Sequence, residues 1–506
     1  MRDSNRQIDR RLTKSLVAAF EQCPRRLWLA INSQVPATAG GAQQRLRAGQ
    51  QVGVFARSLV DGHYVATFDS AQALAMTAEF VAQGDKAIFE AAFVHDDVLV
   101  RVDIMVPERQ AGVVAWHVYE VKGSSAVKSY HVPDLATQLW VIEANGITLA
   151  SAGIRHLNSK FTLEQYGQYD GLFVDSDQLA AAKTIAQDRA KIVARAKALL
   201  GSAEPTCRTG AHCNEPHQCA YITYCSATEP PGPQWPITDL PQTGARLAEK
   251  WGEQGVYDIC DLPDEAGLSA QHERIRQAVK TGLPFHDHAG FAAGLANCVY
   301  PYIWLDFETI AFAIPRWLGT RPFEQIPFQF SAHVEQANGH IDHVEALDLS
   351  GDDPSEQLAA ALAKLPGQGT VFAWYKGAEA TALKTLARRV PKHADALHSL
   401  AARLVDPLVL TKAHYYHPLQ HGSYSIKYVL PSLLPELSYD RLAIGDGMMA
   451  QAAYMEAIES GCDSARKAEI ETQLREYCGQ DTWAMKLVCS KLSNPSETDI
   501  LSVSGD

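Results

Sequence analysis

The sequence predicts a mixed α/β fold, in two domains that a small helical connector joins. Strand-like runs of Val, Ile, Phe and Tyr follow one another in the first half of the chain, at 87–93, 97–104 and 116–122. A second α/β pattern begins with the apolar run 302–306. Between the two patterns, residues 229–236 contain four prolines and one glycine, a composition typical of a linker or a sharp boundary.

Length and composition set the domain organisation. A chain of 506 residues is too long for one ordinary core, so two or three domains are expected. We place the first domain at 1–228, a linker and small helical connector at 229–298, and the second domain at 299–506. Hydrophobic residues at 46% and charged residues at 20% are typical of a soluble globular protein.

Charge and hydropathy indicate which classes of partner the protein is expected to bind. No apolar run approaches the roughly 20 residues that a membrane helix needs, and no signal-like apolar stretch follows the N-terminus. We therefore expect a cytoplasmic protein without a membrane partner. The net charge of −13 argues mildly against tight, nonspecific duplex binding, but it is compatible with carboxylates that hold metal ions.

Three consecutive strands carry the first group of candidate catalytic residues. Glu120 and Lys122 are two residues apart in a strand, so they face the same side. Asp103 on the neighbouring strand can complete a site for Mg²⁺ or Mn²⁺, which prefer oxygen ligands. The lysine can orient or deprotonate a water and offset the charge that develops on phosphorus. Glu90 on the preceding strand is a further candidate ligand, and Gln138 on the next helix is expected to face the site.

This order of residues resembles a known nuclease core. Asp103, Glu120-x-Lys122 and the helix glutamine are similar to the PD-(D/E)xK core of RecB-family nucleases, over about residues 12–228. The resemblance implies a restriction-endonuclease-like first domain. Those nucleases usually place a His or Glu on the first helix after a glycine, whereas residues 48–56 contain neither. We expect weaker metal binding, or Glu90 in that role.

Cysteines bracket this core. Cys213, Cys219 and Cys225 are equally spaced near the end of the predicted domain, and Cys23 lies alone in a Cys-Pro-Arg-Arg-Leu-Trp-Leu segment near its start. Four thiolates are what a [4Fe–4S] cluster needs. Zinc is the competing metal, although its usual close Cys pairs are absent, and free buried thiols are a further alternative. Cys207 is a spare cysteine that can replace any of the four.

The cysteine pattern also resembles the iron–sulfur subgroup of these nucleases, which includes CRISPR-associated adaptation nucleases and helicase-nucleases. The resemblance favours an iron–sulfur cluster bound by Cys23, Cys213, Cys219 and Cys225. His212 and His217 are alternate ligands. We expect the cluster to be structural and to tie the first helix to the end of the domain.

The second half contains another acidic pattern. Asp306 and Glu308 end an apolar strand and face the same way. Residues 369–387 predict a strand, a turn and a helix that begins near Glu379. Tyr477 and Asp481 are four apart in a helical segment, and so lie on one helix face.

In this order these residues resemble the DEDD exonucleases with a tyrosine, which have an RNase H-like fold and include polymerase proofreading domains and RNase D. The resemblance implies that Asp306, Glu308, Glu379 and Asp481 bind two metals about 4 Å apart, and that Tyr477 positions the attacking water. The departure is at the third acid, where that group has Asp; Asp406 is a rival to Glu379.

The sequence predicts that two spans, 319–333 and 421–430, are loops that face the substrate. Arg321 and Lys427 are expected to contact phosphate there, with aromatic neighbours that stack bases.

The whole chain resembles an uncharacterised bacterial family that fuses these two nuclease modules. Our leading hypothesis is a metal-dependent nuclease, an exonuclease on single-stranded DNA or RNA. Because no Gly-x4-Gly-Lys-Ser/Thr pattern is present, a helicase or another repair or defence protein is an expected partner. The alternative is a nucleic-acid-binding or assembly module in which one or both nuclease sites have decayed; a third interpretation makes one domain catalytic and the other a substrate clamp.

Overall fold

The computed structural model describes residues 11–33, 42–110 and 112–494. The chain divides into two compact units: one comprises residues 1–230 and 312–323, and the other comprises residues 231–311 and 324–506. Both units mix helices with a sheet, so the predicted α/β class is confirmed. Within the described ranges, no helix combines the length and the apolar character that crossing a membrane requires.

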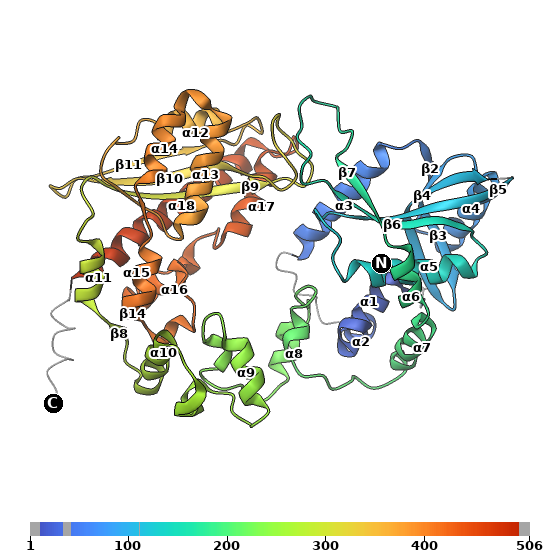
Figure 1. Cartoon of the computed structure of the whole chain (residues 1–506), viewed down its shortest axis with the longest axis horizontal. Coiled ribbons are helices and arrows are strands. Elements are labelled where there is room, and N and C mark those ends of the chain that lie inside the picture. Colours follow the sequence, from blue (N-terminus) through green and yellow to red (C-terminus); the bar gives the residue numbers. More distant parts are fainter. Residues whose placement is uncertain (1–10, 34–41, 111, 495–506) are drawn as a thin grey trace. The chain divides into compact units, whose positions relative to one another are not determined.

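A mixed sheet forms the centre of the first unit (Figure 1). Its main path runs in the order β2-β3-β4-β5-β6-β7, and β1 pairs with β4 in parallel. The strands are β1 Leu12–Thr13, β2 Gly62–Tyr64, β3 Ala87–His95, β4 Val98–Gln110, β5 Val113–Lys122, β6 Leu149–Leu157 and β7 Phe173–Asp177. The three predicted strands are thus confirmed as β3, β4 and β5, each longer than its sequence pattern indicated.

Several helices of the described ranges belong to the first unit. They are α1 Lys14–Gln22, α2 Pro24–Asn32, α3 Ala42–Ser58, α4 Ser70–Gln83, α5 His131–Ala144, α6 Leu179–Ala186, α7 Arg189–Leu200 and α8 Ile222–Ala227. Helix α5, predicted from its amphipathic pattern, packs Leu135, Ala136 and Leu139 onto the apolar side chains of β4, β5 and β6. Burial of these apolar surfaces fixes α5, and with it Gln138, against β5.

The second unit is built on a five-stranded sheet with the order β11-β10-β9-β12-β13. The pairs β9–β10 and β10–β11 are antiparallel, whereas β9–β12 and β12–β13 are parallel. The strands are β9 Tyr302–Ala311, β10 Gln325–Glu335, β11 Ile341–Leu347, β12 Thr370–Phe372 and β13 Leu404–Val405, with a separate pair β8 Phe285–His286 and β14 Tyr415–Tyr416.

The helices of the second unit are α9 Gly244–Gly252, α10 Ala270–Thr281, α11 His288–Leu295, α12 Ser355–Leu362, α13 Lys376–Arg389, α14 Ala394–Ala402, α15 Pro407–His414, α16 Ile426–Leu433, α17 Gly447–Ala457 and α18 Ser464–Ser493. The short helices α9–α11 occupy the region that the sequence marked as a connector, and they group with the second unit. Part of this region packs on Leu408, Tyr416 and Tyr424 of the same unit.

The two faces of the second sheet differ in character. Ile303 and Leu305 of β9 lie in an apolar core with α12, α13 and α14, which lie together over the sheet in Figure 1. The alternate residues, Asp306 and Glu308, project to the face that α18 covers, since Cys478 of α18 contacts Asp306. Strand alternation therefore separates the core from the acidic residues.

Two sequence interpretations need correction. The span 319–333 is not one loop over a substrate: residues 325–335 form the buried strand β10, while 312–323, including Arg321, belong to the first unit. In the span 421–430, residues from Ile426 onward form helix α16, which carries Lys427. The polar residues that suggested loops, such as Gln329, are buried and hydrogen-bonded to α18.

Candidate metal and cluster sites

Three carboxylates form a row across neighbouring strands of the first unit. In the β3–β4 register, Glu90 and Asp103 both lie between the pairs Phe89–Ile104 and Ala91–Val102, and in the β4–β5 register Asp103 and Glu120 come directly after the pair Ile104–Tyr119. Glu90 has a φ of +58°, a conformation that is uncommon for a residue other than glycine. The predicted candidates Glu90, Asp103 and Glu120 are therefore brought together, at a point where the strand pair is locally distorted.

Asp103 is an acid with an unusual environment. Its carboxylate accepts a hydrogen bond from the backbone N–H of Val121 at 2.7 Å. Burial, followed by the nearby charge of Glu120, raises the pKa of Asp103 to about 7. A positive ion bound beside Asp103 would relieve both effects, which fits a metal ligand.

Glu120 is enclosed by cations. Lys14 Nζ lies 2.6 Å from Glu120 Oε1, and Lys122 Nζ lies 3.0 Å from the same oxygen. The amide of Gln138 donates a hydrogen bond to Glu120 Oε2. Burial disfavours the charge on Glu120, but the two lysines outweigh burial and hold its pKa at about 2.

Lys122 and Gln138 are themselves positioned by α5. Lys122 Nζ donates to Asp134 Oδ2 at 2.8 Å, and although burial lowers the pKa of Lys122, the charges of Glu120 and Asp134 raise it above its ordinary value. Gln138 is fully buried, and its Oε1 has no hydrogen-bond partner within the described ranges. The site thus contains an unsatisfied acceptor that faces away from solvent.

Helix α3 contributes an arginine to the acidic row. Arg57 of α3 donates a hydrogen bond to Glu90 Oε1 at 2.6 Å. Lys14, Arg57 and Asp134 were not predicted from the sequence. The sequence gives little indication of these three residues, because each lies on a separate element and has no spacing motif of its own.

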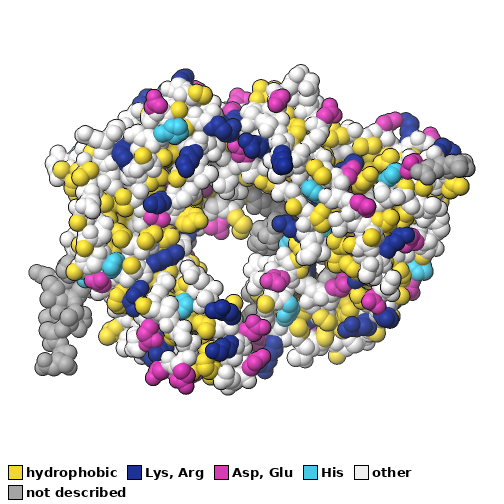
Figure 2. Space-filling view, viewed as in Figure 1, with side chains coloured by type: hydrophobic (Ala, Val, Ile, Leu, Met, Phe, Trp, Pro, Cys, Tyr) yellow, Lys and Arg dark blue, Asp and Glu magenta, His cyan; other side chains and the backbone are white. Residues whose placement is uncertain are grey.

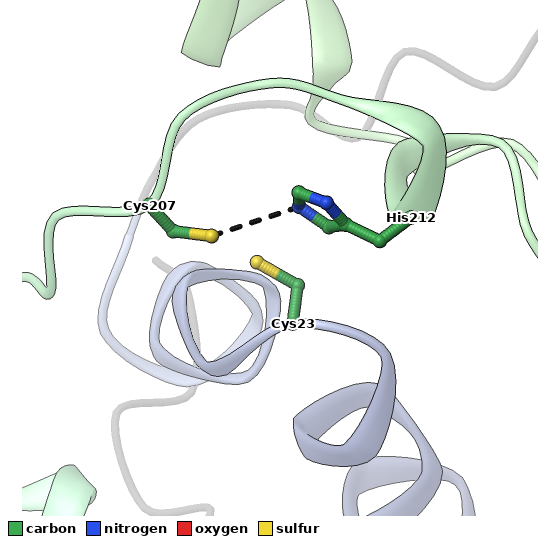
Figure 3. Close-up of side chains that lie close together, drawn as sticks. All are labelled: Cys23, Cys207 and His212. Carbon is green, nitrogen blue, oxygen red and sulfur yellow. Dashed lines mark hydrogen bonds between the residues drawn. The ribbon is translucent and has the colours of Figure 1, made fainter. Parts of the chain in front are cut away.

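The cysteines of the first unit gather around one cavity. Its lining includes the four predicted ligands together with the spare cysteine and a histidine: Cys23, Cys207, His212, Cys213, Cys219 and Cys225. Cys23 lies between α1 and α2, so the cavity joins the start of the unit to the loop before α8. Figure 3 shows Cys23, Cys207 and His212 directed toward one another.

The spare cysteine is part of this group. Candidate ligand atoms of Cys23, Cys207 and His212 all lie within 4.8 Å of one another. His212 Nε2 is 3.6 Å from the sulfur of Cys207 and 3.6 Å from that of Cys213. Burial, and then the neighbouring Cys23, raise the pKa of Cys207 to about 11, so the Cys207 thiol favours ionisation only when a metal compensates the charge.

The cysteine loop also touches the start of α5. The backbone oxygens of His212 and His217 both accept hydrogen bonds from Gln22 Nε2. The ring of His217 packs edge-on against Tyr130, the residue that precedes α5, with ring centroids 5.0 Å apart. The loop is therefore anchored both to α1 and to the helix that carries Gln138.

In the second unit, the predicted acids converge. Ligand oxygens of Asp306, Glu308 and Asp481 lie within 4.8 Å of one another. Burial, and next the charge of Asp481, raise the pKa of Glu308 to about 8 and that of Asp306 well above its ordinary value. Like-charged groups this close cannot all ionise without a compensating cation.

Asp481 and Tyr477 project from one face of α18, as their spacing predicted. Tyr439 donates a hydrogen bond to Asp481 Oδ1 at 2.6 Å. Lys427 Nζ donates to the hydroxyl oxygen of Tyr477 at 2.8 Å and to the carbonyl of Gly445 at 2.7 Å. Lys427 and Tyr439 were not predicted in these positions.

Glu379 is the buried third acid. It lies in the first turn of α13, and its charge contributes to the raised pKa of Asp306. Burial raises the pKa of Glu379 itself to about 8, and its Oε2 has no partner among the described residues. The rival Asp406 is engaged elsewhere: it accepts backbone N–H bonds from Tyr375, Lys376 and Leu408.

Comparison with known proteins gives one family match. A family described as a domain of unknown function (DUF2779) matches residues 303–425. The match includes the strand with Asp306 and Glu308 and the helix with Glu379, and it ends before Tyr477 and Asp481. No curated protein matches the chain.

Proposed function

We propose that the protein is a metal-dependent nuclease, an exonuclease on single-stranded DNA or RNA, whose principal active site is the acidic group of the second unit. The observation that carries the proposal is the convergence of Asp306, Glu308 and Asp481 within 4.8 Å, with Tyr477 one helical turn from Asp481. Buried, like-charged carboxylates are the oxygen ligands that Mg²⁺ and Mn²⁺ require.

The sheet order of the second unit supports this proposal. Three antiparallel strands, β9 to β11, are followed by β12 and β13, which run parallel to β9 on its other side. This arrangement is the one expected of an RNase H-like domain. It places Asp306 and Glu308 on the central strand and sets α18 across them.

The balance of charge distinguishes the two sites. In the second unit, the pKa values of Glu308 and Asp481 are raised by burial, and the charge of Lys427 opposes this rise in both. The carboxylates that act on Asp306 are Glu308, Glu379 and Asp481. Counting the described residues just named, the site has a formal charge of −3 when all are ionised, and a divalent cation would relieve this repulsion.

In the first unit, basic side chains nearly neutralise the charge of the acidic site. Its four acids are Glu90, Asp103, Glu120 and Asp134, and they contact Lys14, Arg57 and Lys122. This group of described residues has a formal charge of −1. We therefore assign it a weaker metal affinity and an auxiliary nuclease or substrate-clamping role, in a PD-(D/E)xK-like domain.

The side chains of the second unit have distinct roles in the proposed reaction. A divalent metal, when bound, supplies charge neutralisation on phosphorus and a water of lowered pKa. Tyr439 holds Asp481 in place. Lys427 keeps the Tyr477 hydroxyl as a hydrogen-bond donor, because the lysine occupies an acceptor lone pair of its oxygen. The hydroxyl can then donate to a phosphate or water oxygen.

The cysteine cavity fits an iron–sulfur cluster. Its thiols line one enclosed space, and Fe–S clusters use Cys thiolates as ligands. The ligands we propose are Cys23, Cys213, Cys219 and Cys225; the closeness of Cys207 to Cys23 makes it the alternate. The bound group would fasten α1 to the loop before α8, which is a structural role.

One observation favours the alternative of a binding module with a decayed site. The segment 48–56 lacks the His or Glu that the resembled nucleases place on their first helix, and Arg57 of α3 pairs with Glu90. This alternative applies to the first unit. On the face in Figure 2, acidic and basic side chains are interspersed over each unit.

A cleavage assay tests the proposal. Protein purified without oxygen is incubated with end-labelled single-stranded DNA or RNA and Mn²⁺, and EDTA is added to a parallel sample. We expect metal-dependent shortening that Asp306→Asn reduces by at least about 100-fold and that Asp103→Asn reduces less. Asp395→Asn, at an exposed aspartate of α14 in the same unit, is the matched control. No metal-dependent cleavage of either substrate by protein with intact cluster absorbance would refute it.

A further inference from the structure

Lys14 is held at the N-terminal start of α1, directly beside the acidic row of the first unit. The two preceding residues form β1, which pairs with Val98 and Leu99 of β4, the strand that carries Asp103. Lys14 is largely buried, with its side chain 16% exposed. Its Nζ is 2.6 Å from Glu120 Oε1, across 106 residues of sequence. The fold thus places a second lysine in a site whose sequence motif contains one.

Both oxygens of Glu120 are already occupied by donors. Oε1 contacts Lys14 and Lys122, and Oε2 accepts from Gln138. Oε1 has two lone pairs and already accepts from two lysines, so a divalent cation that binds Glu120 through Oε1 must displace one of them, because a lone pair that accepts a hydrogen bond cannot also bind a metal.

The other contacts of the donors indicate which one yields. Lys122 retains Asp134 as a partner at 2.8 Å when it leaves Glu120. Gln138 is fully buried and fixed within α5. In the part of the chain that the structure describes, Lys14 makes its ion pair with Glu120, and the long, flexible lysine side chain can move without disturbing the sheet.

We propose that Lys14 is a positioning residue that occupies Glu120 Oε1 in the metal-free protein and competes with the divalent cation for that oxygen. The inference rests on the proposed function, since it concerns the metal site of the first unit. Lys14 keeps the carboxylate ionised and correctly placed, and it yields the oxygen when the cation binds. The displaced ammonium remains tethered at the start of α1, beside the site, where it can contact a substrate phosphate.

Direct metal binding tests this competition independently of cleavage. Mn²⁺ is titrated at pH 8 and free Mn²⁺ is followed by electron paramagnetic resonance, in a background with Asp306→Asn and Asp481→Asn that disables the second site. We expect Lys14→Met to tighten Mn²⁺ binding by about tenfold, which corresponds to about 1.4 kcal/mol. Lys14→Arg should weaken binding, because a guanidinium holds a carboxylate through two hydrogen bonds.

Lys197→Met is the matched control. Lys197 also makes short ion pairs in the first unit, with Asp96 at 2.6 Å and Asp97 at 3.2 Å, but it does not contact the acidic row. Its loss should leave the Mn²⁺ affinity unchanged. A general effect of removing one positive charge would instead appear in both Lys→Met variants.

The outcomes separate the inference from the proposed function. Unchanged or weaker Mn²⁺ binding by folded Lys14→Met overturns the competition while the metal site itself stands. If Lys14→Met fails to fold, Lys14→Arg decides, and binding as tight as in the background protein overturns it. Absence of Mn²⁺ binding in the background protein, with Asp103→Asn indistinguishable from it, refutes the metal site of the first unit and the inference together.

Discussion

The charge states of the two sites predict opposite effects of the same substitution. Glu308 in the second unit lies among like charges, whereas Glu120 in the first unit lies between two lysines. Glu308→Gln and Glu120→Gln both replace a buried carboxylate with a neutral amide of similar shape. In the metal-free protein at pH 8, we expect Glu308→Gln to stabilise the second unit and Glu120→Gln to destabilise the first.

The magnitudes follow from linkage between protonation and folding. Burial and the neighbouring carboxylates raise the pKa of Glu308 from 4.5 to about 8, which costs on the order of 5 kcal/mol at about 1.4 kcal/mol per unit of pKa. Because several carboxylates share this repulsion, we expect a gain of about 2–3 kcal/mol in Glu308→Gln. The pKa of Glu120 falls from 4.5 to about 2, so Glu120→Gln should lose about 3–4 kcal/mol.

The pH dependence has opposite sign in the two units. A carboxyl group whose pKa is raised by folding destabilises the protein as pH rises, here from about 4.5 to about 8 for Glu308. A carboxyl group whose pKa is lowered by folding stabilises the protein at pH values above about 4.5. For Glu120, this stabilisation is lost as the pH falls toward 2. Saturating Mg²⁺ should remove the first dependence in wild type, whereas Glu308→Gln should lack the contribution of Glu308 with or without Mg²⁺.

Hydrogen exchange measured by mass spectrometry can follow both units in one sample. Peptides from β9 and α18 report the second unit, and peptides from β5 and α5 report the first. Each variant serves as the control for the other unit. A decrease in protection of the second unit in metal-free Glu308→Gln, or a shift in the same direction for both variants, would refute this account of the charges.

Three other predictions concern single groups. Tyr477→Phe removes the hydroxyl that Lys427 contacts. It should lower kcat by about 10–100-fold and leave the Mn²⁺ affinity unchanged. A loss of Mn²⁺ affinity as large as the loss of kcat would contradict a role of Tyr477 in orienting water. Burial, and then the charge of His343, lower the pKa of His333 to about 4. The free energy of unfolding, measured by urea titration, should therefore decrease as the pH falls from 6.5 to 4 in wild type, and decrease less in His333→Gln. Equal slopes with pH in the two proteins would exclude this effect of His333. Cys219→Ser should lose the visible absorbance of the cluster and lower the stability of the first unit. Cys462→Ser, at a partly exposed cysteine, should change neither. Unchanged absorbance in Cys219→Ser would show that Cys219 is not a cluster ligand.

Local patterns were sufficient to predict much of the framework. The strands with Asp103, Glu120 and Asp306 are predicted from runs rich in Val, Ile, Phe and Tyr. Because residues two apart in a strand face the same side, the acidic residues within these runs also indicate the functional face. Tyr477 and Asp481 lie within one helix, where the spacing of four fixes a common face.

Residues that meet across long sequence separations could not be predicted in this way. Lys14 reaches Glu120 across 106 residues, and Lys427 reaches Tyr477 across 50. Neither lysine has a local spacing motif, because the role of Lys14 depends on how the start of α1 packs beside a sheet, and that of Lys427 on how α16 packs against α18. Strand β10 was missed for another reason: its polar residues, such as Ser331, are buried against α18, so they imitate the composition of a loop.

The central claim is that the acids of the second unit form a divalent metal site. A crystal grown with Mn²⁺ and measured at the manganese absorption edge tests it most directly. We predict anomalous scattering among Asp306, Glu308 and Asp481, which Asp306→Asn removes. A map without an anomalous peak among these carboxylates, from wild-type crystals at saturating Mn²⁺, would contradict the claim.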